Sequence, residues 1–166
     1  MKTDLFLPPF ISDTSQGILR YVPKTVGLCL GGSLLGGIVG LVLVRHSLPP
    51  NLVAPSVLLT LFGLVVFSPV TETLALGAIL LLLRRLVAPD WGVALCSATL
   101  WAAFHSLLSL RWGFFVFAPF YYMTLCYLAW VRVSVWKALG VTTLVHASSN
   151  LLPAVFLVLR GAAGHP

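Results

Sequence analysis

The stretch FSPVTETLAL, residues 67–76, places a carboxylate in the middle of a long apolar run. That carboxylate belongs to Glu72, which is the only glutamate in the chain. An ionisable side chain in apolar surroundings is energetically costly, and where one is kept it usually has a function. Two questions follow: what solvent surrounds this run, and which chemistry requires Glu72 there.

The composition indicates that the solvent is a lipid bilayer. Of the 166 residues, 59% are hydrophobic and only 8% are charged, and the mean hydropathy is +1.03. A soluble domain of this length could not hide so much apolar surface from water. Apolar runs of about 18 residues or more are typical of membrane-spanning helices. We therefore predict an all-α, integral membrane helical bundle of about five transmembrane helices.

The basic and sulfur-containing residues fit this environment. The net charge is +6, but Lys and Arg stand singly or in pairs between apolar runs, as membrane-flanking anchors do, which excludes nucleic acid as a partner. Cys29, Cys96 and Cys126 lie in apolar segments without metal or redox spacing, and we expect them to be small buried residues. The opening MKTDLFLPPFISD has too short an apolar stretch for a cleavable signal, so the first span should remain as an anchor.

The chain is expected to form one domain after a short leader. Residues 1–25 should be a cytoplasmic N-terminal lead-in, and residues 26–160 a single transmembrane helical domain. The expected spans are residues 26–44, 52–83, 91–110, 112–130 and about 138–159. The loop at Arg111 is so short that the third and fourth spans should form a tight antiparallel hairpin.

The run 52–83 is too long for a simple span. As one helix it would extend about 48 Å, against a hydrocarbon core of about 30 Å. It is either one kinked, tilted span or two short segments that meet near Pro69. A single crossing puts seven Lys and Arg residues on one side (Lys2, Arg20, Lys24, Arg84, Arg85, Arg132, Lys137) and three on the other (Arg45, Arg111, Arg160). A double crossing puts five on each side, so the positive-inside rule favours the single crossing, with the N-terminus cytoplasmic.

The first span is rich in glycine. Its sequence GLCLGGSLLGGIVG contains three pairs of glycines four residues apart, at 27/31, 32/36 and 36/40. Small residues at this spacing let two helix backbones approach closely in lipid. We predict that these glycines pack against a neighbouring helix.

Four polar residues lie inside the spans at similar depth. We count the depth of each residue from the cytoplasmic end of its own helix, which is Arg84, Asp90 or Lys137. At a rise of 1.5 Å per residue, the depths are about 18 Å for Glu72, 22 Å for His105, 14 Å for His146 and 20 Å for Asn150. His46 and His165 lie in a loop and the tail, where we expect them to be solvated. Three helices thus carry polar groups in one slab near the bilayer centre, and these groups can converge.

Local spacing adds to this pattern. His146 and Asn150 are four residues apart in HASSN, so they share one face of a helix. Pro69 stands three residues before Glu72 and has no N–H, so it should disturb the helical bond to the carbonyl of Val65 and kink the helix.

The set is suited to hydrolysis. A carboxyl in a site of low dielectric can exchange a proton with water near neutral pH, and an imidazole can orient that water. A second imidazole with an amide N–H can stabilise an oxyanion. No serine or cysteine nucleophile is in register with a base, so water is the nucleophile and a peptide bond in or near the membrane is the natural target. Zinc held by Glu72, His105 and His146 is the competing chemistry, but the lone carboxylate would then be a ligand and not a base. No cofactor is otherwise expected.

These residues resemble the motifs of the CPBP family of glutamic-type intramembrane proteases (CAAX protease and bacteriocin-processing, also called Abi). The family carries a Pro-x-x-Glu-Glu-x-x-x-Arg motif, a Phe-x-x-x-His motif and a His-x-x-x-Asn motif on successive helices. Here Pro69 and Glu72 match the first motif, His105 in WAAFH the second, and HASSN the third, over about residues 55–155. The resemblance implies a bacterial inner-membrane protease whose substrate is a membrane-anchored protein or peptide.

The resemblance also implies a role for each residue. Glu72 would activate water with the help of His105, while His146 and Asn150 would form the oxyanion site. The substrates implied for small divergent members include C-terminal sorting signals. Two positions depart from the family pattern, because Thr73 replaces the second glutamate and Gly77 the arginine. These departures keep open a catalytically inactive scaffold or immunity-type protein of the same fold. A small proton-coupled carrier is the third alternative.

Overall fold

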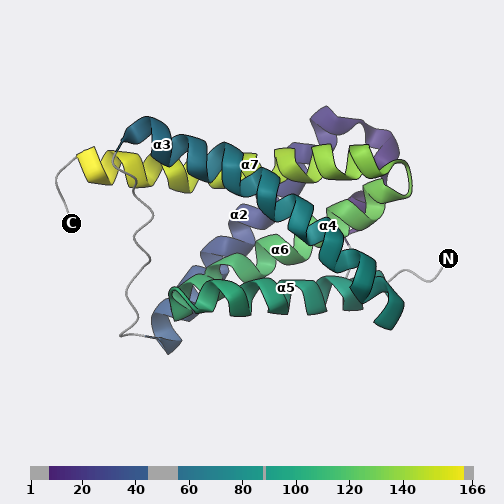
Figure 1. Ribbon diagram of the computed structural model, residues 1–166, viewed down its shortest axis with the longest axis horizontal. Helices are drawn as coiled ribbons and strands as arrows, with labels where there is room; N and C mark the ends of the chain where they lie inside the picture. Colours follow the sequence, from purple (N-terminus) through teal and green to yellow (C-terminus); the bar gives the residue numbers. More distant parts are fainter. Residues whose placement is uncertain (1–7, 45–55, 88, 163–166) are drawn as a thin grey trace.

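The computed structural model describes residues 8–44, 56–87 and 89–162, and all regular secondary structure in these ranges is helical (Figure 1). The elements are α1 (Pro9–Ser12), η1 (Thr14–Gln16), α2 (Ile18–Leu43), α3 (Val57–Phe62), the π-helical turn η2 (Gly63–Phe67), α4 (Ser68–Leu86), α5 (Asp90–Ser106), α6 (Leu110–Val131) and α7 (Val135–Ala162). The predicted all-α class is confirmed for this part of the chain. Lys2, Arg45, His46, His165 and residues 52–55 lie outside the described residues, and so does the side chain of Arg160.

Four helices are long and apolar enough to cross a membrane. They are α2, the continuous helix Val57–Leu86 formed by α3, η2 and α4, then α6, and α7 as far as Leu159. The chain is therefore a multi-pass membrane protein by the length and composition of its helices. The predicted third span, 91–110, corresponds to α5, which has only 17 residues and ends at Ser106.

The long run 52–83 is one helix where it is described, and not two segments. The backbone N–H of Ser68 donates to the carbonyl of Gly63, five residues back, so a π turn joins α3 to α4 without a break. Pro69 follows as the second residue of α4, and because it has no N–H it cannot donate to a carbonyl in the preceding turn of this continuous helix. The single-crossing alternative is thus favoured by a continuous helical backbone.

The first span begins eight residues earlier than predicted, at Ile18 instead of residue 26. The polar residues of its first turns have partners inside the protein, which the prediction of a cytoplasmic lead-in overlooked. Tyr21 is fully buried, its hydroxyl donates to the carbonyl of Ile11 at 3.0 Å, and its ring meets Trp130 edge-on at 5.4 Å. The lead-in was expected over residues 1–25, but from Ile18 onwards these residues belong to the bundle.

Glycines of α2 form a close interface with α6, but not all the predicted ones. A Cβ on Gly32 would collide with Ala118, and one on Gly36 would collide with the backbone carbonyl of Phe114. The pairs 32/36 and 36/40 therefore pack as predicted. The pair 27/31 was predicted wrongly, because a Cβ at either position meets nothing within 4 Å. Gly27 precedes Gly32 by five residues, which turns it about 140° around the helix from that face.

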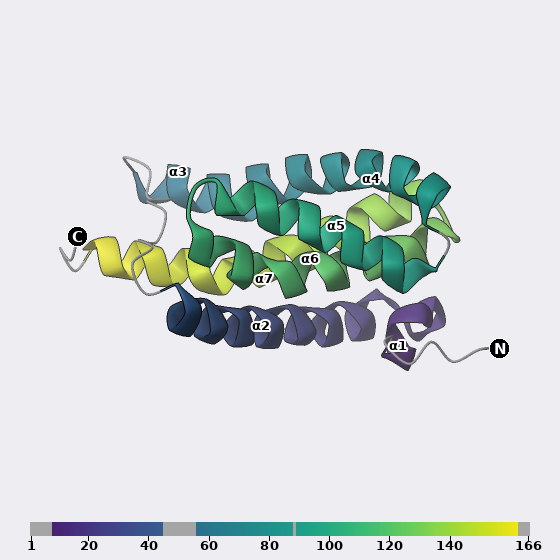
Figure 2. The same cartoon turned by 90° about the horizontal axis from the view of Figure 1, so that it is seen from below.

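The hairpin of α5 and α6 is confirmed, with one correction at its turn. Figures 1 and 2 show the two helices side by side, joined by a short connection at residues 107–109. Arg111 lies in the first turn of α6 and not in the loop, and its Nε donates to the carbonyl of Val44 at 2.6 Å. This bond ties the end of α2 to the beginning of α6. Of the three free cysteines, Cys29 and Cys126 are buried as expected, and Cys96 is half-buried.

Candidate active site

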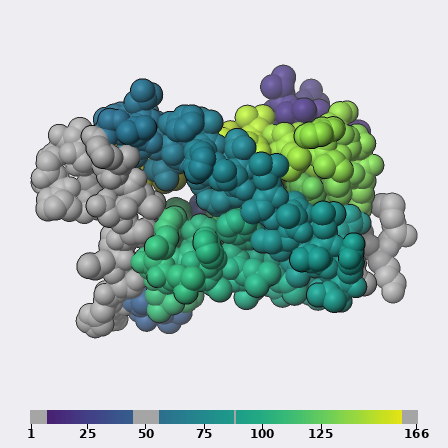
Figure 3. All heavy atoms as spheres, viewed as in Figure 1, coloured from purple at the N-terminus to yellow at the C-terminus, as the bar shows by residue number. Residues whose placement is uncertain are grey.

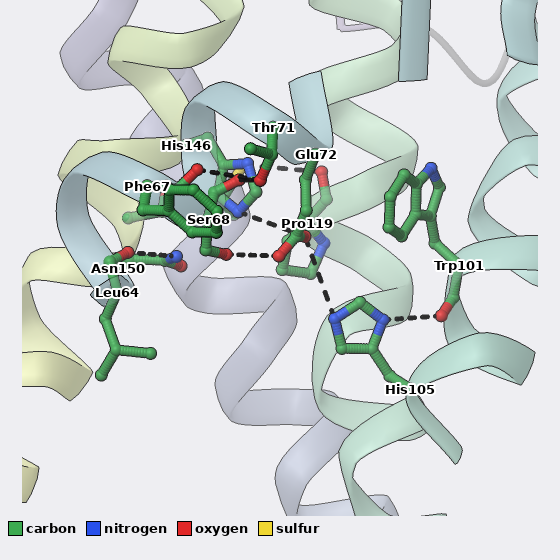
Figure 4. A network of polar contacts seen from close by, with 12 residues as sticks. Leu64, Phe67, Ser68, Thr71, Glu72, Trp101, His105, Pro119, His146 and Asn150 are labelled. Atoms are coloured by element: carbon green, nitrogen blue, oxygen red, sulfur yellow. Dashed lines mark hydrogen bonds and ion pairs between the residues drawn. The ribbon is translucent and has the colours of Figure 1, made fainter. Parts of the chain in front are cut away.

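The carboxyl group of Glu72 lies between two imidazole rings. Its Oε2 atom is 3.9 Å from Nε2 of His105 and 3.9 Å from Nε2 of His146, and Figure 4 shows both rings turned towards it. The three groups come from α4, α5 and α7, so the convergence predicted from their depths is found for these three residues. Both separations are too long for a direct hydrogen bond and suit a bridging water molecule.

Ser68 holds the other oxygen of this carboxyl group. Its hydroxyl donates to Oε1 of Glu72, one helical turn further along. The two carboxyl oxygens therefore have different surroundings, a hydroxyl donor at Oε1 and two imidazoles at Oε2. Ser68 was not among the predicted site residues, although the four-residue spacing that puts it on the same helix face as Glu72 was available as a signal.

The ring of His105 is fixed in orientation and tautomer. Its Nδ1 lies 2.8 Å from the backbone carbonyl oxygen of Trp101, one turn earlier in α5. A carbonyl oxygen only accepts, so Nδ1 must carry a hydrogen. In the neutral ring the lone pair is then on Nε2, the atom that faces Glu72. An imidazole held in this way is suited to accept a proton from water lying between it and the carboxyl group.

Aromatic rings enclose both histidines. Trp112 meets the ring of His105 edge-on at 4.7 Å, and Phe120 meets that of His146 at 5.6 Å. Trp101 stacks on Phe120 with ring centroids 4.5 Å apart. Both histidines are buried, whereas 23% of the Glu72 side chain remains exposed. The carboxyl group is therefore the most accessible of the three.

Asn150 lies near these groups but makes a different contact. Its Nδ2 donates to the backbone carbonyl of Leu64, in the π turn, at 2.9 Å. The disturbed carbonyl was expected at Val65, four residues before Pro69. The π turn moves the hydrogen-bond register to five residues, so the carbonyl that faces Pro69 is that of Leu64.

The four predicted residues share one cavity of about 270 Å³. Residues from α2, η2, α4, α5, α6 and α7 line it, and most of them are apolar. The polar side chains on its wall are those of Ser33, Ser68, Glu72, His105, His146, Ser149 and Asn150. Figure 3 shows this face of the molecule hollowed between the α3–α4 helix and α5, which carry Leu64 and His105.

The two departures from the expected motif face the protein interior. Thr73 is buried, and its Oγ1 is one of three buried side-chain polar atoms without a hydrogen-bond partner among the described residues. A Cβ on Gly77 would lie 2.9 Å from the hydroxyl of Tyr127. The ring of Tyr127 thus fills the space that a long side chain at position 77 would need.

The zinc alternative would use Glu72, His105 and His146. Among the described residues, no group of three or more His, Cys, Asp or Glu side chains has the arrangement of a metal site. The other described carboxylates, Asp13 and Asp90, stand in the lead-in and at the beginning of α5, and Asp90 is paired with Arg132. None of them could replace Glu72 as base if it bound a metal.

Comparison with known proteins adds no relative to this picture. No protein-family model matches the chain, and no curated protein and no solved structure matches it significantly. The assignment of a function therefore depends on the residues around Glu72 and on their geometry.

Proposed function

We propose that this protein is an intramembrane endopeptidase that uses Glu72 to activate water. The observation that carries the proposal is the position of the Glu72 carboxyl group, 3.9 Å from the Nε2 atoms of both His105 and His146. Three proton-exchanging groups on the wall of one cavity are what hydrolysis without a serine or cysteine nucleophile requires. The motif resemblance supports a place for the chain in the CPBP family as a short, divergent member.

The proposed reaction begins with water between Glu72 and His105. Oε2 of Glu72 takes a proton as the water oxygen bonds to the scissile carbonyl carbon, and Nε2 of His105 orients the water. His146 donates to the oxyanion that forms. The C–N bond then breaks, and the proton held by Glu72 passes to the leaving amine, which restores the site. The new carboxylic acid loses the second proton of the water molecule to solvent and leaves as a carboxylate. The resemblance implies a place for Asn150 beside His146, but its Nδ2 donates to the carbonyl of Leu64, so the proposed mechanism gives Asn150 no contact with the oxyanion.

We place the chain in a bacterial inner membrane, with α5 as a fifth span and the N-terminus in the cytoplasm. The 17 residues of α5 rise about 26 Å, close to the thickness of the hydrocarbon core. The α4–α5 and α6–α7 connections and the start of α2 lie at one end of the bundle (Figure 1). That end carries Arg20, Lys24, Arg84, Arg85, Arg132 and Lys137, as the positive-inside rule expects of the cytoplasmic side.

The proposed substrate is a membrane-anchored protein or peptide, and C-terminal sorting signals are the class that the resemblance favours. A cavity with mostly apolar walls and a few convergent polar groups supports a peptide bond flanked by apolar side chains. The polar groups are at the depth of the membrane centre, so a substrate must present its bond there or be drawn into the bundle.

The test compares cells that carry the wild-type chain, Glu72→Gln, and Asp13→Asn as a matched carboxylate-to-amide control outside the cavity. Quantitative mass spectrometry of protein C-termini reads out the uncut substrates. We expect some membrane-anchored proteins to keep an uncut tail only with Glu72→Gln, while all three variants accumulate equally. Identical C-termini in all three strains, with a phenotype on deletion of the gene, would contradict the proposal.

An inactive scaffold is the second candidate, because Thr73 and Gly77 replace two polar residues of the expected motif. A scaffold predicts that Glu72→Gln is silent in every assay. A proton-coupled carrier, the third candidate, predicts that the same variant abolishes transport and leaves all C-termini unchanged.

A further inference from the structure

The π turn Gly63–Phe67 contains a carbonyl group that its own helix does not satisfy through the usual register. The N–H of Ser68 donates to Gly63, five residues back, and so is not available to Leu64. In the same five-residue register the donor for Leu64 would be residue 69. That residue is Pro69, which has no N–H.

Asn150 supplies the missing donor from another helix. Its Nδ2 lies 2.9 Å from the Leu64 oxygen and joins α7 to η2 across 86 residues of sequence. Because a carbonyl oxygen only accepts, the amide nitrogen and not Oδ1 must face it. In a cavity with apolar walls, loss of such a donor leaves the carbonyl with an uncompensated desolvation cost.

The register of the π turn decides where the residues that follow it point. Ser68 is the first residue of α4 and Glu72 lies one turn later. A return from the five-residue to the four-residue register would rotate α4 relative to α3 by about 100°. Ser68 and Glu72 would then lose their common direction towards the histidines.

We propose that Asn150 is a positioning residue, which holds the π turn through the Leu64 carbonyl and thereby aims Ser68 and Glu72 into the cavity. This role takes the place of the oxyanion contact that the family resemblance implies for it. The significance for catalysis rests on the proposed function, but the contact itself does not. Pro69 and Asn150 form a complementary pair, in which one removes a donor from the helix and the other replaces it from outside.

The test measures hydrogen–deuterium exchange of the purified full chain in detergent micelles, by mass spectrometry of peptides that cover residues 60–75. Asn150→Ala should raise exchange in the π turn at least roughly fivefold, as loss of one buried hydrogen bond implies. Asn150→Leu keeps the volume without a donor and should do the same. His146→Ala, one turn earlier on the same face, is the matched control and should leave exchange in the π turn unchanged while it abolishes cleavage.

A double-mutant cycle with Pro69→Ala sharpens the result. This substitution restores a backbone N–H at position 69, and in its background Asn150→Ala should no longer accelerate exchange in residues 63–67. Unchanged exchange in both Asn150 variants, together with lost cleavage, would overturn the proposal and return Asn150 to the oxyanion site. An equal effect of Asn150→Ala with and without Pro69 would overturn it as well. Exchange needs no substrate, so failure of the protease proposal would appear separately, as wild-type C-termini with Glu72→Gln.

Discussion

Gly36 is the position at which the α2–α6 interface is tightest, and Gly36→Ala tests how much the bundle depends on it. A Cβ there would collide with the carbonyl oxygen of Phe114 and lie 2.9 Å from its carbonyl carbon. The colliding atoms belong to the backbone of α6, so no side-chain rotation can relieve the contact. The two helices must move apart by on the order of 1 Å.

The expected cost follows from this displacement. Overpacking by one carbon in a close-packed interface typically costs about 1–3 kcal/mol, and separation of the helices along their length places the cost at the upper end of that range. Gly31→Ala is the matched control, because its Cβ meets nothing within 4 Å and the residue gains up to about 1 kcal/mol of helix propensity. Both glycines lie inside α2, so this gain is common to the two variants, and we expect them to differ by the overpacking cost alone, about 2–3 kcal/mol in free energy of unfolding.

The assay is reversible unfolding in mixed micelles with increasing SDS, followed by the far-UV circular dichroism and the fluorescence of the five tryptophans. Gly36→Ala should unfold at lower SDS than the wild type, and Gly31→Ala at equal or higher SDS. If the two variants unfold at the same SDS concentration, α2 does not approach α6 through Gly36. The close packing derived from the glycine spacing would then be refuted.

Three further predictions concern the cavity and the lead-in. Ser68→Ala removes the donor to Glu72 and should lower kcat/KM about 10- to 100-fold in a cleavage assay, while Ser68→Thr retains most activity; equal activity of the two would contradict the role of the hydroxyl. Gly77→Arg introduces the arginine of the motif that the chain resembles but collides with Tyr127, so it should reduce stability by more than about 3 kcal/mol and not raise activity, as unfolding in SDS and cleavage will measure. Hydrogen bonds from the hydroxyl and the backbone N–H of Ser15 hold the pKa of Asp13 below its ordinary value of 3.8. Their contribution is complete above that value and is lost as the pH falls through the lower pKa of the folded state. Acidification should therefore first loosen residues 9–16, as limited pepsin digestion of the wild type and Asp13→Asn will detect.

The meeting of Glu72, His105 and His146 could be predicted because depth along a helix is a matter of counting. A constant rise per residue converts sequence distance from a charged helix end into position across the membrane. The structure brings the three side chains together at equal distances of 3.9 Å from the carboxyl group to each ring. The direction in which Asn150 points was not accessible in this way, because a shared helix face with His146 does not say what lies opposite each residue.

The partners of these residues were missed for a related reason. Ser68 and the Trp101 carbonyl could have been proposed from four-residue spacing, since each lies one turn before the residue it contacts. The Leu64 carbonyl could not, because the choice between a four-residue and a five-residue register depends on packing against α7. The buried start of α2 was missed because Tyr21 is polar in sequence but has its partners, Ile11 and Trp130, inside the bundle.

Composition and hydrophobic run length alone determined that this chain is a helical, multi-pass membrane protein, because in lipid every backbone polar group must be paired within its own segment. Periodicity and depth then indicated Glu72 and its two histidines. The tertiary structure decided which oxygen of Glu72 faces the imidazoles, which glycines of α2 meet α6, and how Pro69 and Asn150 together hold the π turn. These features depend on the rotation of one helix against another, which side-chain packing sets and which no repeat along a single helix records.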